Sequence, residues 1–119
     1  PINKAKTSWF EGIKMLLNVA VDGQNVDINV PDSMLSEARD FFAKVDADLD
    51  KGYQMGRYWV NNPNGEQRCQ IAADKLVTAI ENENKNMDTM MSSYILSIAH
   101  HIESVVVDSG DEIQEIYFI

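Results

Sequence analysis

With 119 residues and a hydrophobic content of 45%, the chain can bury one core, and we expect a single domain over residues 1–119. Its 19 acidic residues outnumber 10 basic ones, and the resulting net charge of −9 at pH 7 argues against binding to the phosphate backbone of nucleic acids. The single cysteine, Cys69, excludes an internal disulfide and a cysteine-cluster zinc site.

No run of about 18 apolar residues occurs, so no transmembrane helix is expected. The apolar segment from Ile13 to Val21 is interrupted by Lys14 and Asn18, and no small-residue cleavage site of a signal peptide follows it. We therefore expect a cytoplasmic protein that binds neither membranes nor nucleic acid.

The N-terminal segment supports two interpretations. Ser8 and Glu11 form a capping-box pattern, and the apolar residues that follow fit a helix. Asp22-Gly23, however, stands between alternating apolar residues, which is the pattern of a β-hairpin with a tight turn. We favour a hairpin across Lys14 to Val30.

A helix is expected next, with Asp32 or Ser33 as its N-terminal cap and Gly52 just past its end. Apolar residues recur every three or four positions, as a half-buried helix requires. This stripe consists of Leu35, Ala38, Phe42, Val45 and Leu49.

The acidic end of this helix, Asp46-Ala47-Asp48-Leu49-Asp50, has the opening pattern of a calcium-binding loop. Such a loop has Gly at its sixth position and Glu at its twelfth, but these positions hold Lys51 and Arg57. We interpret the acidic run as a solvated helix end, with weak cation binding as the alternative.

The connection from Tyr53 to Gly65 is the least regular part of the chain and is interpreted as a loop. It contains Tyr53, Arg57, Tyr58 and Trp59, and Trp, Tyr and Arg are enriched in interface hot spots. These four are the candidate binding residues. The alternative is that Tyr58 and Trp59 cover the hydrophobic core while Tyr53 and Arg57 face water.

Two amphipathic helices are expected within residues 66–102, and the rest of the chain is organised around them. Apolar residues recur at helical spacing from Cys69 to Ile80 and again from Met87 to Ile102. Cys69 lies on the apolar face of the first helix, so we expect a buried, structural thiol.

The end of the second helix is expected to place His100 and Glu103 on one face, with His101 about a quarter-turn away. Metal sites in helical bundles combine such pairs with carboxylates from neighbouring helices. A single pair of ligands rarely suffices, so no metal or other cofactor is expected. His100, His101 and Glu103 remain the candidates if a metal is bound.

The C-terminal segment again supports two interpretations. Val105 to Val107 and Ile113 to Ile119 read as two strands joined by a turn, which is the interpretation we favour. The alternative is a terminal helix capped by Ser109 with Glu112.

These elements predict an α+β fold in which two terminal β-hairpins form a small antiparallel sheet packed on about three helices, with an all-α bundle as the alternative. Because phosphate-loop, dinucleotide and nucleophile-elbow motifs are absent from the sequence, an enzyme is not favoured. We expect a non-enzymatic protein-interaction or homo-oligomeric module that binds itself or another protein through the aromatic loop. The alternative is a small metal-binding protein or enzyme centred on His100, His101 and Glu103.

Overall fold

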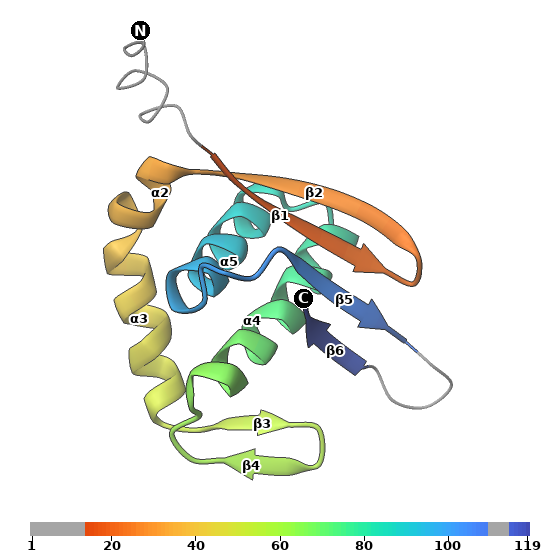
Figure 1. The fold of residues 1–119 in the computed structure, drawn as a ribbon. Helices are drawn as coiled ribbons and strands as arrows, with labels where there is room; N and C mark the ends of the chain where they lie inside the picture. Colours follow the sequence, from red (N-terminus) through yellow and green to blue (C-terminus); the bar gives the residue numbers. More distant parts are fainter. Residues whose placement is uncertain (1–13, 110–114) are drawn as a thin grey trace, which may run out of the picture.

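The computed structural model describes residues 14–109 and 115–119, which form a four-stranded sheet with helices packed against one of its faces (Figure 1). The strand order in the sheet is β2-β1-β5-β6. The elements are β1 (Lys14–Val21), β2 (Gln24–Pro31), α2 (Asp32–Glu37), α3 (Arg39–Asp50), β3 (Tyr53–Met55), β4 (Tyr58–Val60), α4 (Gly65–Glu81), α5 (Lys85–Ile98), β5 (Ser104–Asp108) and β6 (Glu115–Phe118). The predicted α+β class is confirmed, and the all-α alternative is wrong.

The N-terminal hairpin is present as predicted. Strands β1 and β2 pair in antiparallel register from the partners Val21 and Gln24 outward. Asp22 and Gly23, with φ of 50° and 86°, form the two-residue turn between them. Positive φ at both central positions is the requirement of a type I′ turn, which Asp-Gly satisfies at low steric cost. The capping box predicted at Ser8 lies outside the described residues.

The C-terminal hairpin is also present, since β5 and β6 pair in antiparallel register. Gly110 and Asp111 of the predicted turn, and Glu112 of the alternative helix cap, lie outside the described residues.

The sheet differs from the prediction in one respect, because its central pair is parallel: Asn18 lies opposite Ser104, and Val21 lies opposite Val107. Strand β2 ends beside the start of β1, and the intervening helices return the chain to this same end of the sheet, so β5 runs beside β1 in the same direction. The sheet is therefore mixed rather than antiparallel.

The core lies between this sheet and helices α4 and α5. Alternate strand residues point to the helices, while the intervening ones point away. Buried strand residues are Leu17, Val19, Ile28, Val30, Val105 and Val107. The opposite face carries a polar ladder, in which Asn18 Nδ2 donates to Asp27 Oδ1 at 2.9 Å and Ser104 Oγ donates to Asn18 Oδ1 at 2.8 Å.

The single helix predicted before Gly52 is divided into α2 and α3 at Ala38, whose φ of −91° and ψ of 17° leave helical geometry. Pro31 is the N-cap residue of α2 and makes no side-chain cap bond, so the predicted cap at Asp32 or Ser33 is wrong. Gly52 follows the C-cap of α3 with φ of 106°, as predicted for a glycine that ends a helix.

The segment predicted as an irregular loop contains a second, small hairpin. Strands β3 and β4 pair in antiparallel register, and Met55 lies opposite Tyr58. The two residues between them are Gly56, at φ of 62°, and Arg57. Glycine at the first central position with positive φ is typical of a type II′ turn.

Helices α4 and α5 are present as predicted, except that α5 ends at Ile98 instead of continuing to Ile102. Asn64 and Gln67 form a capping box at the start of α4: Gln67 N donates to Asn64 Oδ1 at 2.8 Å, and Asn64 N donates to Gln67 Oε1 at 2.9 Å. Helix α5 is buried almost all round, because it lies between the sheet, α4 and α2. None of the described helices combines the length and apolar character needed to cross a membrane.

Candidate functional site

The β3–β4 hairpin brings three of the four candidate binding residues to the surface. Tyr58 is 75% exposed, Trp59 is 58% exposed, and Arg57 at the turn is exposed as well. Tyr58 shares a hairpin face with its partner Met55, whereas Trp59 shares the other face with Gln54. The two aromatic side chains therefore project from opposite faces of one narrow hairpin.

Trp59 is exposed but held in place. Its ring lies directly over Gly52, since a Cβ added to that glycine would be 2.6 Å from the indole. Its Nε1 donates a hydrogen bond of 2.9 Å to Asn61 Oδ1. A large aromatic side chain that is already fixed loses little conformational entropy when a partner covers it.

Tyr53 has a different position from the other three candidates. It is partly buried against the core, and Lys75 Nζ lies 5.2 Å from the centroid of its ring. This contact is a cation–π interaction that ties β3 to α4. The alternative prediction is wrong for three residues, since Tyr58 and Trp59 do not cover the core and Tyr53 does not face water. Its expectation that Arg57 faces water is confirmed.

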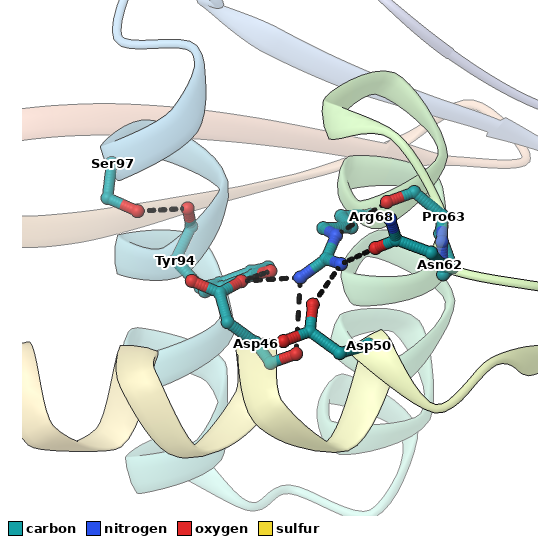
Figure 2. Close-up of polar contacts among 7 residues, drawn as sticks. All are labelled: Asp46, Asp50, Asn62, Pro63, Arg68, Tyr94 and Ser97. Atoms are coloured by element: carbon teal, nitrogen blue, oxygen red, sulfur yellow. Dashed lines mark hydrogen bonds and ion pairs between the residues drawn. The ribbon is translucent and has the colours of Figure 1, made fainter.

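The acidic run of α3 is part of an ion-pair cluster around Arg68 (Figure 2). Asp46 and Asp50 are four residues apart and therefore lie on the same side of the helix. Arg68 Nη1 lies 3.0 Å from Asp46 Oδ1, and Arg68 Nη2 lies 2.7 Å from Asp50 Oδ1. Arg68 thus pairs with two of the three carboxylates of the acidic run.

Every N–H of Arg68 has an acceptor. Nε donates to Pro63 O at 2.7 Å, Nη1 also reaches Asp46 O at 3.3 Å, and Nη2 also donates to Asn62 Oδ1 at 3.0 Å. The bond to Asp50 is the main reason why the pKa of Arg68 is raised. With five donors committed, the guanidinium has none left for a ligand, and its role is structural.

Tyr94 joins the same cluster from α5. Its hydroxyl donates a hydrogen bond of 2.6 Å to Asp46 Oδ1. Burial raises the pKa of the Tyr94 phenol, and the Asp46 carboxylate raises it further. The cluster therefore links α3, α4 and α5 with the segment that follows β4.

The predicted helical arrangement of His100, His101 and Glu103 is wrong. Helix α5 ends at Ile98, because Ala99 has φ of −137° and ψ of 75°, which directs the chain away from the helix axis. The two exposed histidine rings have centroids 6.4 Å apart and are nearly perpendicular. Within the described ranges of the chain, no three His, Cys, Asp or Glu side chains converge as a metal site.

Cys69 is only 3% exposed, which confirms the predicted burial of the thiol. Burial raises its pKa to about 11, and Glu66 contributes to the increase. A thiol in this setting stays protonated at neutral pH and is a poor nucleophile.

Comparisons with protein-family models, curated proteins and solved structures found no match for this chain. Function is therefore inferred from the residues themselves.

Proposed function

We propose that this protein is a non-enzymatic protein-interaction module that binds a partner protein, or a second copy of itself, through the β3–β4 hairpin. The observation that carries the proposal is the exposure of Tyr58 and Trp59, at 75% and 58%, beside an exposed arginine. Tyr, Trp and Arg are enriched among the residues that dominate binding energy in interfaces. Tyr and Trp desolvate a large area with few rotatable bonds.

The hairpin geometry constrains how a partner can bind. Tyr58 and Trp59 point from opposite faces, so a flat partner surface reaches only one of them. A partner that contacts both must receive the hairpin tip in a groove. The tip is open for this, since a Cβ added at Gly56 would meet no atom within 4 Å.

Self-association is the first measurement, by sedimentation equilibrium between low micromolar and millimolar protein. Trp59→Ala and Tyr58→Ala remove the exposed aromatic rings, and Leu16→Ala is the matched control because Leu16 is 51% exposed on the main sheet. If the partner is a second copy, Trp59→Ala should weaken the dimer about 30-fold or more, as expected for a hot-spot residue worth about 2 kcal/mol. Leu16→Ala should leave the dimer unchanged.

A protein that stays monomeric at all concentrations directs the search to another partner, which is tested by cross-linking in cells with the same three variants. A cross-linked partner that is lost with Trp59→Ala and retained with Leu16→Ala supports the proposal. Self-association or partner binding that survives the loss of both aromatic rings would refute it. We propose the cytoplasm as the compartment, where the free thiol of Cys69 remains reduced.

A further inference from the structure

The free edge of β6 is a second surface, and the cavities beside it are not lined by Tyr58 or Trp59. In the described part of the chain, β6 is the last strand of the main sheet, and it lies on the side of the β3–β4 hairpin (Figure 1). Ser104 N donates to Ile119 O at 3.2 Å, and Ile119 N donates to Ser104 O at 2.9 Å. Because bonded pairs alternate along an antiparallel ladder, Tyr117 also bonds toward β5. The N–H and C=O groups of Ile116 and Phe118 therefore point outward.

The pairing of β5 with β1 gives the same result independently. Asn18 N donates to Glu103 O at 3.1 Å, and Asp22 N donates to Val107 O at 2.9 Å. The backbone groups of odd-numbered residues in β5 thus bond to β1, and those of even-numbered residues in β5 bond to β6. Ile116 and Phe118 lie opposite the odd-numbered residues Val107 and Val105, so their N–H and C=O groups face away from the sheet.

Two cavities lie along this outward edge, and Gln70 and Ile116 line both. Gln70 Nε2 donates to Ile116 O at 3.5 Å, which is longer than the usual N–H···O distance of about 2.7–3.2 Å, so a better-placed donor can replace it. The smaller cavity, about 360 Å³, separates Ile116 from the β3–β4 hairpin. The larger cavity, about 570 Å³, has a mostly apolar lining that includes Cys69, Ile98, Ala99, Ile102, Phe118 and Ile119.

We propose that an extended, basic segment of another protein binds along β6 as an added strand. The outward N–H and C=O groups of Ile116 and Phe118 supply the backbone hydrogen bonds, as in other cases of strand addition. Alternate side chains of the added strand then face the larger cavity, whose lining favours apolar residues. The intervening positions point to the other face of the sheet, where Glu115 is exposed, and they carry Lys or Arg.

Charge selects this partner over a second copy. Glu66 lines the larger cavity and Asp74 lines the smaller one, and the described residues that line the two cavities include neither Lys nor Arg. Glu115 is exposed at the start of β6. Two copies placed edge to edge would bring these carboxylates together in chains that each carry a net charge of −9, whereas a basic segment is attracted. Neither cavity is lined by the exposed aromatic rings of the hairpin, so this inference does not depend on the proposed function.

The test uses a fluorescein-labelled peptide of alternating lysine and valine, seven residues long, and measures its binding by fluorescence anisotropy. A second peptide has the same side chains but carries N-methyl groups on alternate peptide nitrogens, which removes strand hydrogen bonds on one edge and keeps the charge. We expect at least tenfold weaker binding of the methylated peptide. Equal binding of both peptides, or no binding by the first at 0.5 mM protein, would overturn the proposal.

Two variants of one residue test the edge from the protein side. Phe118→Pro removes the outward N–H without disturbing the ladder to β5, and proline is tolerated at such edge positions. Phe118→Ala removes the same side chain but keeps the N–H. We expect Phe118→Pro to bind the peptide at least tenfold more weakly than Phe118→Ala, with circular dichroism confirming that both fold. Equal binding by the two variants, or a wild-type dimer that only Phe118→Pro dissociates, would overturn the proposal.

Discussion

Arg68 offers the most direct test of how this fold is held together. Its side chain is 11% exposed, and its partners Asp46 and Asp50 are 50% and 63% exposed. Removing one partner of a fully buried ion pair costs about 3–5 kcal/mol, whereas exposed pairs contribute about 0–1 kcal/mol. The guanidinium is buried while both carboxylates are about half exposed, so the cluster lies between these two cases. Arg68→Ala should therefore destabilise the fold by about 2–3 kcal/mol.

The unfolding entropy of a chain of this length, at about 2.1 cal/mol/K per residue, converts that loss to a fall in Tm of about 8–12 °C. Urea denaturation followed by circular dichroism measures the free energy directly. Arg68→Lys keeps the charge but loses the planar fork that reaches all the acceptors, so we expect it to recover about half of the loss.

Arg57→Ala is the matched control, since Arg57 is exposed at the turn of the small hairpin. Substitutions of this kind change stability by about 0.5 kcal/mol or less. If Arg68→Ala were as mild as Arg57→Ala, the cluster would contribute nothing measurable and the structural role assigned to it would be wrong.

Four further positions give sharp expectations. Gly56→Ala should cost about 1–2 kcal/mol of stability, because it adds only the strain of a positive φ. Gly52→Ala also places a Cβ 2.6 Å from the Trp59 ring, so urea denaturation should show a cost at least about 1 kcal/mol larger. Equal costs for the two substitutions would contradict the packing of Trp59 over Gly52. Asp88 is 8% exposed, and burial raises the pKa of its carboxyl. The Asp88 carboxyl therefore loses its proton more readily in the unfolded state than in the folded state, and it reduces stability as pH rises above about 4. Asp88→Asn should consequently stabilise the protein more at pH 7 than at pH 4. A gain that is the same at both pH values would refute this. The pKa of Cys69, raised by burial to about 11, predicts a reaction with a thiol reagent at pH 8 about 100-fold slower than in the urea-unfolded chain, and similar rates would show that the thiol is accessible.

The elements that could be predicted from the sequence carry their signals locally. Asp22-Gly23 specifies its turn because both residues tolerate positive φ, and Gly52 marks a helix end for the same reason. The β3–β4 hairpin was missed because three-residue strands are too short to show an alternating pattern. Its one local signal is Gly56 between two short aromatic-containing segments, which suits a type II′ turn.

Tertiary effects explain the remaining differences. Alanine has the highest intrinsic helix propensity of the amino acids, so the sequence predicts that α5 continues through Ala99. In the structure the chain leaves the helix at Ala99 in order to enter β5. The spacing of Asp46 and Asp50 shows that both can reach one cation, yet nothing local selects Arg68 among the 10 basic residues. That choice depends on where the fold places Arg68 of α4 relative to α3, which periodicity does not specify.

The Arg68 cluster also bears on the proposed binding hairpin, because it holds the chain at both ends of that hairpin. Asp50 lies just before β3, and Asn62 and Pro63 lie just after β4, and all three bind the same guanidinium. Fixing both ends limits the motion of the two short strands, which share no long ladder of their own. An exposed Trp59 held in one orientation is a better anchor than a mobile one, since less ordering remains when a partner binds. Arg68→Ala should therefore weaken partner binding even at temperatures where the variant is fully folded, and unchanged affinity there would show that the hairpin is ordered without the cluster.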